Sequence, residues 1–319
     1  MPLKSVSSPT HISDQLLRAI AILGVVLIHF LAMFRQSPYV ESSPFQLTAV
    51  TLDQLFRVSV PLFVALSGYG LSQKYAKSTL RWGEFLRRRV WKLLPLYIGW
   101  SVFYYLILRL VPSWRPTWPT NSLLTQILLG QADYQMYFVP MIFQLYLLFP
   151  FLLIIRKRWP LLLFISAAVL QAAVYLIFMR QEPLQIGSIL FVDQNQYILC
   201  LSWIFYFVLG MYLPQLHNLL KRLPLLFWIL LGATLFSGVW TVATAVENIN
   251  QGIDPLVALR FTRFSIMAYA SVSILILTWL ARGITKIPSF ISFAGKHSYS
   301  IYLSHTLFLR ILFTFGPFK

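Results

Sequence analysis

The stretch Arg18-Ala-Ile-Ala-Ile-Leu-Gly-Val-Val-Leu-Ile-His29-Phe30 decides the fold class of this chain. It is long and apolar enough to enter a membrane, yet it begins with an arginine and carries a histidine deep inside. A helix turns by about 100° per residue, so Arg18 and His29 lie on one stripe, roughly 16 Å apart along the axis. Ionisable groups at bilayer depth are costly, and such a pair therefore indicates a functional site.

The apolar character extends over the whole chain. Of its 319 residues, 58% are hydrophobic and only 11% are charged, whereas about 25% of the residues of a soluble domain are charged. We therefore predict an all-α integral membrane protein, a polytopic bundle of about nine to ten transmembrane helices in a single domain over residues 1–319. The predicted spans are residues 16–34, 54–72, 90–110, 137–155, 160–179, 197–213, 223–246, 264–280 and 290–313, and residues 123–129 form a tenth, shorter apolar piece.

The net charge of +17 is distributed in short basic clusters between the apolar segments. Every second loop is basic, and the alternate loops hold most of the acidic residues. This pattern predicts a multi-pass protein with a cytoplasmic N-terminus. It favours contact of the basic loops with anionic membrane lipids and argues against a nucleic-acid partner.

The sequence offers few candidates for a bound metal or cofactor. Cys200 is the single cysteine, which excludes an intrachain disulfide and a cysteine-based metal cluster. Metal-binding and nucleotide-binding motifs do not occur, so we expect neither a metal site nor a bound cofactor.

Arg18 and His29 are the first candidates for chemistry. An arginine at the start of a span also fits the positive-inside pattern, so Arg18 alone would be an orientation signal. A histidine inside a span needs a partner and titrates near neutrality. His29 could act as a general base on a hydroxyl group, or accept an acyl group for a short time.

The second candidate is a basic run at the start of the third predicted span, Phe85-Leu-Arg-Arg-Arg-Val-Trp-Lys-Leu-Leu-Pro-Leu-Tyr97. Arg88 and Lys92 share a helix face, as Arg89 and Lys92 do. Such a cluster suits phosphate groups, because an arginine can bind one with two parallel hydrogen bonds. An orientation signal explains the same run equally well.

Two further stretches combine small or polar residues with apolar ones. In Val58-Ser-Val-Pro-Leu-Phe-Val-Ala-Leu-Ser-Gly-Tyr69, the proline frees a backbone carbonyl and Ser67-Gly68 permits close backbone approach, although packing alone can require both. In the last span, Ser298, Tyr302 and His305 follow the i, i+4, i+7 spacing of one polar helix stripe. A polar stripe faces protein or water, and spacing does not distinguish a substrate path from interhelical contacts.

These stretches, in this order, resemble the membrane acyltransferase-3 family of bacterial inner membranes. The resemblance covers nearly the whole chain, and its strength lies in the shared order of motifs that are individually weak. The motifs are Arg18-x10-His29, Val60-Pro-Leu-Phe-x-x-x-Ser-Gly-Tyr69, Arg87-Arg-Arg-x-x-Lys-x-x-Pro-x-Tyr97, Tyr137-Phe-Val-Pro140, Tyr146-Leu-Leu-Phe-Pro150 and Gly295-x-x-Ser-Tyr-x-x-Tyr-Leu-x-His305.

The resemblance implies a multi-pass enzyme of the inner (plasma) membrane that transfers an acyl group, commonly acetyl, from cytoplasmic acyl-CoA to a hydroxyl of an exported or lipid-linked glycan. Acyl-CoA is then a co-substrate and the glycan is the acceptor. The resemblance makes His29 the catalytic histidine and Arg18 its partner. It assigns acyl-CoA binding and the donor path to Arg87, Arg88, Arg89, Lys92, Ser67 and Gly68, and secondary pore positions to Ser298, Tyr302 and His305.

The sequence departs from the family at one informative place. A large branch of the family has a tryptophan and a glutamate in the fourth span, where this chain has Tyr137 and apolar residues such as Ile142. We therefore expect no carboxylate from that span to support the histidine.

Two other functions fit the same polar stripes. A transporter or flippase of a lipid-linked sugar would be independent of acyl-CoA and would have internal repeats, and we find no clear repeat. A non-catalytic partner of a polysaccharide synthase would have no need of Arg18 and His29, and both are present.

Overall fold

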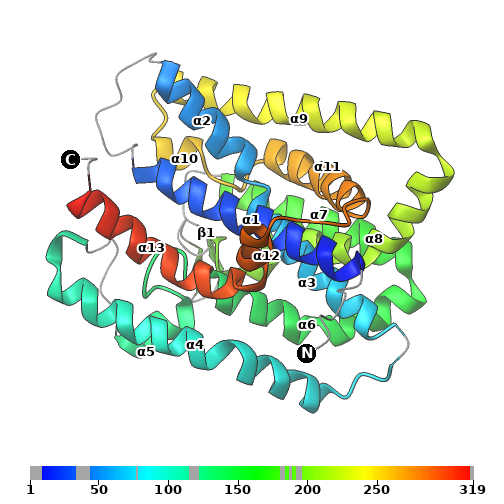
Figure 1. Cartoon of the computed structure of the whole chain (residues 1–319), viewed down its shortest axis with the longest axis horizontal. Helices are drawn as coiled ribbons and strands as arrows, with labels where there is room; N and C mark the ends of the chain where they lie inside the picture. The colour runs from blue at the N-terminus through cyan, green and yellow to red at the C-terminus, as the bar shows by residue number, and fades with distance from the viewer. Residues whose placement is uncertain are drawn as a thin grey trace, which may run out of the picture. The chain divides into compact units, whose positions relative to one another are not determined.

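The computed structural model describes residues 9–33, 44–76, 78–114, 122–179, 184–186, 189–191 and 196–316. The described chain is helical apart from its connections and one two-stranded antiparallel hairpin, in which Leu184 pairs with Phe191 (Figure 1). The α-helices are α1 (Pro9–Met33), α2 (Pro44–Phe56), α3 (Ser59–Lys74), α4 (Trp82–Leu110), α5 (Leu123–Leu129), α6 (Phe138–Arg158), α7 (Pro160–Met179), α8 (Ile204–Arg222), α9 (Pro224–Asn250), α10 (Pro255–Ala258), α11 (Phe264–Ala281), α12 (Ser289–Lys296) and α13 (Ser298–Phe315). The strands are β1 (Leu184–Ile186) and β2 (Ile189–Phe191), and 3₁₀ turns occupy Pro112–Trp114 and Cys200–Ser202.

The predicted all-α character is confirmed, whereas the predicted number of spans is not. Within the described ranges, 7 segments are long and apolar enough to cross a membrane. They comprise α1, α2 together with α3, α4, α6, α7, α9 and α11. The helices α8 and α13 are outside this set: α8 ends with polar and basic residues, and α13 carries His305, Thr306 and Arg310.

The boundaries of several predicted spans are corrected. Residues 160–179 and 123–129 coincide with α7 and α5. The predicted second span, residues 54–72, is instead two helices that meet at a turn at Arg57 and Val58. Pro61 lies in the first turn of α3, where its missing N–H breaks no helical hydrogen bond.

Polar side chains explain why the predicted sixth span, residues 197–213, begins without an α-helix. Gln144 of α6 donates to the carbonyl of Ile198 (2.8 Å) and accepts the N–H of Cys200 (3.2 Å). Gln171 of α7 accepts the N–H of Phe205 (2.9 Å). Backbone groups in apolar surroundings need hydrogen-bond partners inside the protein. Here the side-chain amides of Gln144 and Gln171 supply these hydrogen bonds in place of a helix.

The elements form two compact units, and each is described by itself. Unit 1 contains residues 1–69 and 209–302, and unit 2 contains residues 70–208 and 303–319. In unit 1, α1 packs against α12, α2 and α11, and α9 packs against α11 and α2. In unit 2, α4 packs against α5 and α6, and α6 packs against α7.

Glycine permits close helix contacts in unit 1. A Cβ atom at Gly295 of α12 would lie 2.0 Å from the carbonyl oxygen of Gln15 in α1, and one at Gly24 would lie 2.1 Å from Oγ of Ser59. Neither contact leaves room for a larger residue. The hydroxyl of Ser292 also donates to Oε1 of Gln15 (2.7 Å). Packing therefore explains Gly295, the first residue of the last sequence motif.

Candidate active site

Arg18 and His29 both lie on α1, as the sequence predicts. Arg18 has an ion pair with Asp14 one turn earlier, with 2.9 Å between Nε and Oδ2. The two side chains are 37% and 43% exposed, so this pair remains in contact with solvent or head groups. His29 is half-buried. Asp14 was not among the site residues predicted from the sequence, although its i,i+4 spacing from Arg18 is that of a helical ion pair.

Ser67 and Gly68 lie in the same unit, on α3. Gly68 is buried and Ser67 is half-buried. The hydroxyl of Ser67 donates to the carbonyl of Phe63 one turn earlier (3.0 Å). A serine that bonds its own helix needs no other partner at membrane depth, and its assignment to a donor path stays a prediction.

The basic run lies inside α4, not before it, because α4 begins at Trp82. Arg87, Arg88 and Lys92 are exposed, and Arg88 has an ion pair with Glu84. Arg89 differs from its neighbours. Its guanidinium lies over the rings of Phe85 (5.6 Å) and Tyr146 (5.2 Å), and the side chain is half-buried.

An aromatic cluster holds this end of α4 against α6. Phe85 contacts the rings of Tyr75, Tyr146 and Phe149 at centroid distances of 5.8, 6.3 and 5.7 Å. Phe149 also contacts Phe207 at 6.1 Å. Since Arg89 stacks on this cluster, it is a packing residue, whereas the side chains of Arg87, Arg88 and Lys92 are exposed.

The predicted last span, residues 290–313, is wrong as a single helix, because α12 and α13 meet at His297. Ser298, Tyr302 and His305 nevertheless lie on α13, and all three are buried. The ring of Tyr302 stacks on that of Tyr299 at 6.3 Å. The predicted polar stripe is therefore present, and it faces protein.

The most complete polar network of unit 2 was not predicted from the sequence. Asp133 precedes α6, and Arg310 lies on α13. Arg310 binds Asp133 with two hydrogen bonds, Nη1 to Oδ2 and Nη2 to Oδ1, each 2.7 Å long. The hydroxyl of Thr306 and the N–H of Tyr134 add one hydrogen bond each to the same carboxylate, both 2.9 Å long. The side chains of Arg310 and Asp133 are 9% and 0% exposed.

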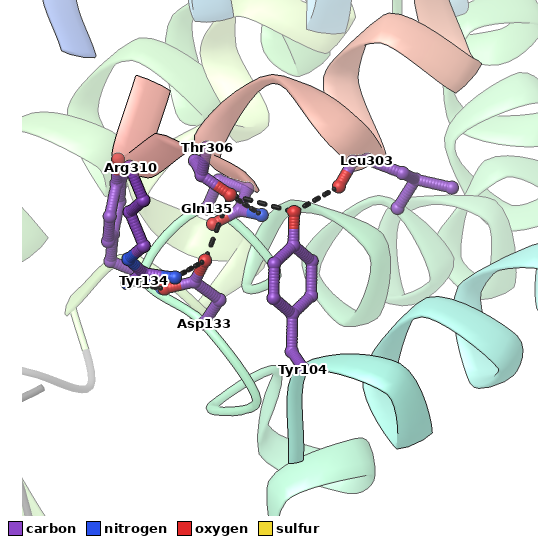
Figure 2. Close-up of polar contacts among 7 residues, drawn as sticks. All are labelled: Tyr104, Asp133, Tyr134, Gln135, Leu303, Thr306 and Arg310. Carbon is purple, nitrogen blue, oxygen red and sulfur yellow. Dashed lines mark hydrogen bonds and ion pairs between the residues drawn. The ribbon is translucent and has the colours of Figure 1, made fainter. Parts of the chain in front are cut away.

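Figure 2 shows how this network extends to α4. The hydroxyl of Tyr104 donates to the carbonyl of Leu303 (2.7 Å) and lies 2.8 Å from Oγ1 of Thr306. Gln135 donates to the same threonine oxygen (2.8 Å). The network therefore connects α13 to α4 and to the segment before α6. An arginine in an apolar span was the available signal, since such a charge needs a buried partner.

A second buried network lies in unit 1, at the turn between α2 and α3. Asp53 accepts hydrogen bonds from Nε (3.2 Å) and Nη2 (3.1 Å) of Arg57 and from Gln54 (2.7 Å). Gln54 in turn accepts from Arg263, which precedes α11. Arg263 also donates to Oγ1 of Thr244 (3.0 Å). This network contains two guanidinium groups and one carboxylate, and the sequence analysis did not identify it.

The predicted site residues are thus divided between the units. Unit 1 contains Arg18, His29, Ser67, Gly68, Ser298 and Tyr302, and unit 2 contains Arg87, Arg88, Arg89, Lys92 and His305. Within unit 1, the packing of Gly295 on Gln15 places the start of the last sequence motif beside the Arg18 end of α1. Within the described residues, no group of three or more histidine, cysteine or acidic side chains could hold a metal ion.

Comparison with known proteins assigns the chain to a family. The acyltransferase domain family, acyltransferase-3, matches residues 15–319. The Bacillus subtilis (strain 168) protein named "Putative membrane-bound acyltransferase YfiQ" is 23% identical over 300 residues, which cover 93% of this chain and 80% of that protein. No solved structure matches the chain. The match over residues 15–319 includes both units and every candidate site residue, and the chain belongs to the acyltransferase-3 family of membrane acyltransferases.

Proposed function

We propose that this acyltransferase transfers an acyl group, acetyl in the first instance, from cytoplasmic acyl-CoA to a hydroxyl of an exported or lipid-linked glycan. The observation that carries the proposal is a half-buried histidine, His29, on the same helix stripe as Arg18. An ionisable side chain inside an apolar helix is costly and marks function. Imidazole is also the side chain best suited to proton transfer near neutral pH.

The reaction balances with His29 as general base. The imidazole takes the proton of the acceptor hydroxyl, whose oxygen attacks the thioester carbonyl. The C–S bond breaks, and the proton passes to the departing thiolate, which leaves the ester and free coenzyme A. With His29 as acyl carrier, the imidazole nitrogen attacks first and coenzyme A leaves. The acceptor hydroxyl then displaces the imidazole from the acyl group.

The exposed cations of α4 fit the donor end of this reaction. Coenzyme A carries several phosphate charges, and Arg87, Arg88 and Lys92 present three cations on the first turns of α4. Arg88 shares its charge with Glu84. We therefore expect Arg87 to contribute more to phosphate binding than Arg88, with Arg89 acting through its packing on Tyr146.

The charge distribution supports the orientation that this reaction needs. Basic residues occupy the last turns of α6 and α8, and Arg282 follows α11. If α8 and α13 cross the membrane with the 7 candidate spans, these basic ends and the basic run of α4 face one side. The positive-inside rule makes that side the cytoplasm, together with the N-terminus, in an inner membrane.

The first test is binding of acetyl-CoA to the purified full-length protein in a detergent that keeps it folded. The variants are Arg87→Ala/Arg88→Ala, which leaves the packing of Arg89 intact, and His29→Ala, and Lys157→Ala/Arg158→Ala is the charge-matched control at the end of α6. We expect binding to be lost in the first variant and kept in the other two. Absence of binding by the wild type would contradict the proposal, and full transferase activity of His29→Ala would remove His29 from the reaction.

A second experiment separates the two roles of His29. The protein is incubated with acetyl-labelled acetyl-CoA without an acceptor and then denatured rapidly. If the label stays on the wild type after denaturation and is absent from His29→Ala, His29 is an acyl carrier. Absence of label, together with transfer when a glycan acceptor is added, would identify a general base.

A further inference from the structure

Among the described residues, the two guanidinium groups at the turn between α2 and α3 share a single carboxylate, that of Asp53. Asp53 is fully buried, and its ion pair with Arg57 accounts for one positive charge. Arg263 is 8% exposed, and its hydrogen bonds go to neutral oxygen atoms, on Gln54, Thr244 and the backbone of Thr241. Among the described residues, Arg263 has no carboxylate within ion-pair distance.

Two buried polar atoms of this network have no hydrogen-bond partner in the described part of the chain. They are Nε of Arg263 and Oγ1 of Thr241. Nη2 of Arg263 lies 3.3 Å from the carbonyl of Thr241, so the two residues are in contact. Both unpartnered atoms can donate a hydrogen bond. Buried donors are nearly always paired, and a buried cation without a counterion is costly. An anionic oxygen would satisfy both requirements.

The position of this network within unit 1 indicates which anion is relevant. The helices α1 and α2 pack against each other. His29 lies near the C-terminal end of α1, and the turn that contains Arg57 follows α2. Arg263 directly precedes α11, and Thr241 and Thr244 lie in the second half of α9. In the proposed orientation, the C-terminal ends of α1 and α9 and the N-terminal ends of α2 and α11 all face the extracytoplasmic side, where the acceptor arrives.

We infer that Arg263, with Arg57 and the hydroxyl of Thr241, binds one anionic group, a carboxylate or a phosphate, of the glycan acceptor or its lipid carrier. This inference rests on the proposed function for the identity of the acceptor. A single anionic group matches the single unbalanced positive charge. Arg263 is 8% exposed and the side chain of Arg57 is 17% exposed, which suits a substrate group that enters the protein more than a head group of the surrounding bilayer.

The test measures thermal unfolding of the full-length protein in a neutral detergent without acyl-CoA. Sodium phosphate or sodium glucuronate is added against sodium chloride at constant ionic strength, because a ligand that binds only the folded state raises the midpoint. We expect both anions to raise the midpoint of the wild type, and Arg263→Gln to abolish that rise. Asp53→Asn leaves both arginines without a carboxylate partner. This variant should bind phosphate more tightly, so that the same rise of the midpoint is reached at a several-fold lower phosphate concentration.

Three controls make the result specific. Arg260→Gln removes an arginine three residues before Arg263 and should retain the rise. Arg87→Ala/Arg88→Ala removes two exposed cations of α4, and it should also retain the rise. Arg57→Gln gives a second reading of the site, with a weaker rise expected, in case Arg263→Gln does not fold.

Each contrary outcome would overturn the inference. If neither anion changes the unfolding midpoint of the wild type, Arg263 has only a structural role. A rise that depends on Arg87 and Arg88, and not on Arg263, would place the anion at α4. The unfolding midpoint is also compared between nanodiscs of phosphatidylglycerol and nanodiscs of phosphatidylcholine. A midpoint that is higher in phosphatidylglycerol, that depends on Arg263 and that does not respond to glucuronate would identify a lipid head group as the ligand instead of the acceptor.

The result is independent of the test of the proposed function. If the wild type binds acetyl-CoA but shows no anion effect, the inference fails and the acyltransferase reaction stands. If the wild type binds the two anions through Arg263 but does not bind acetyl-CoA, the anion site stands and the proposed reaction fails.

Discussion

Two buried arginines of this protein have opposite surroundings. Arg310 of unit 2 forms two hydrogen bonds with the carboxylate of Asp133, each 2.7 Å long. Arg263 of unit 1 bonds only neutral oxygens, and its Nε has no partner among the described residues. Burial lowers the pKa of Arg263 to about 10, so it remains charged at neutral pH. A matched buried pair fixes structure, whereas an unmatched buried charge is a candidate to bind a ligand.

The largest effect is expected for Arg310→Met. The substitution leaves Asp133 buried without its cation, which costs about 3–5 kcal/mol of unfolding free energy when a buried pair is broken. Thermal or chemical unfolding in detergent measures the loss. The control is Arg109→Met, which removes an exposed arginine over the ring of Tyr105 and should cost about 1 kcal/mol or less.

The double variant Asp133→Asn/Arg310→Met completes this test. Removal of both charges should restore part of the lost stability, because neither partner is then left charged and buried. A double variant that is less stable than Arg310→Met would contradict the assignment of the loss to the unpaired carboxylate.

A smaller effect is expected for Asp53→Asn. Arg57 loses its ion pair but its side chain is 17% exposed and can reach water, so the cost should be about 1–3 kcal/mol. The same unfolding experiment with added phosphate sharpens the comparison. Phosphate should reduce the difference in stability between Asp53→Asn and the wild type. It should stabilise Arg310→Met only as much as it stabilises the wild type, because the Arg263 site is unchanged in that variant. Equal behaviour of the two variants would remove the distinction between the clusters.

Tyr104→Phe tests the outer part of the Asp133 network. It removes the hydrogen bonds to Leu303 and Thr306 without changing the ring, and a single intramolecular hydrogen bond contributes about 0.5–1.5 kcal/mol. The free energy of unfolding of this variant should therefore lie between that of the wild type and that of Arg310→Met. A loss as large as that of Arg310→Met would mean that Tyr104 is part of the pair itself.

For Arg263→Met the loss should also stay below that of Arg310→Met, at about 1–3 kcal/mol, because hydrogen bonds to Gln54 and Thr244 are lost but no buried carboxylate is left without its cation. The variant is measured in chloride without phosphate or glucuronate, where the proposed ligand is absent. A loss as large as that of Arg310→Met would show that both arginines are structural.

Local patterns were sufficient for much of the helical architecture. The apolar run of α7 predicted its bounds, Pro160–Met179, to the residue, because a membrane helix needs a continuous apolar segment. The spacing of Ser298, Tyr302 and His305 predicted one polar stripe for the same local reason, and the structure shows that all three side chains are buried. The interruptions at Arg57 and at His297 were missed, since hydropathy records apolar content and not the path of the backbone.

The sequence by itself determined the membrane character, the helical class, the positions of Arg18 and His29 on one helix and the basic run on α4, because all of these depend on neighbours along the chain. Only the tertiary structure decided which buried charges have partners. Asp133 and Arg310 are 177 residues apart, and Arg263 and Gln54 are 209 residues apart. No local periodicity reports such a contact, and these contacts determine that one arginine is neutralised while the other is not.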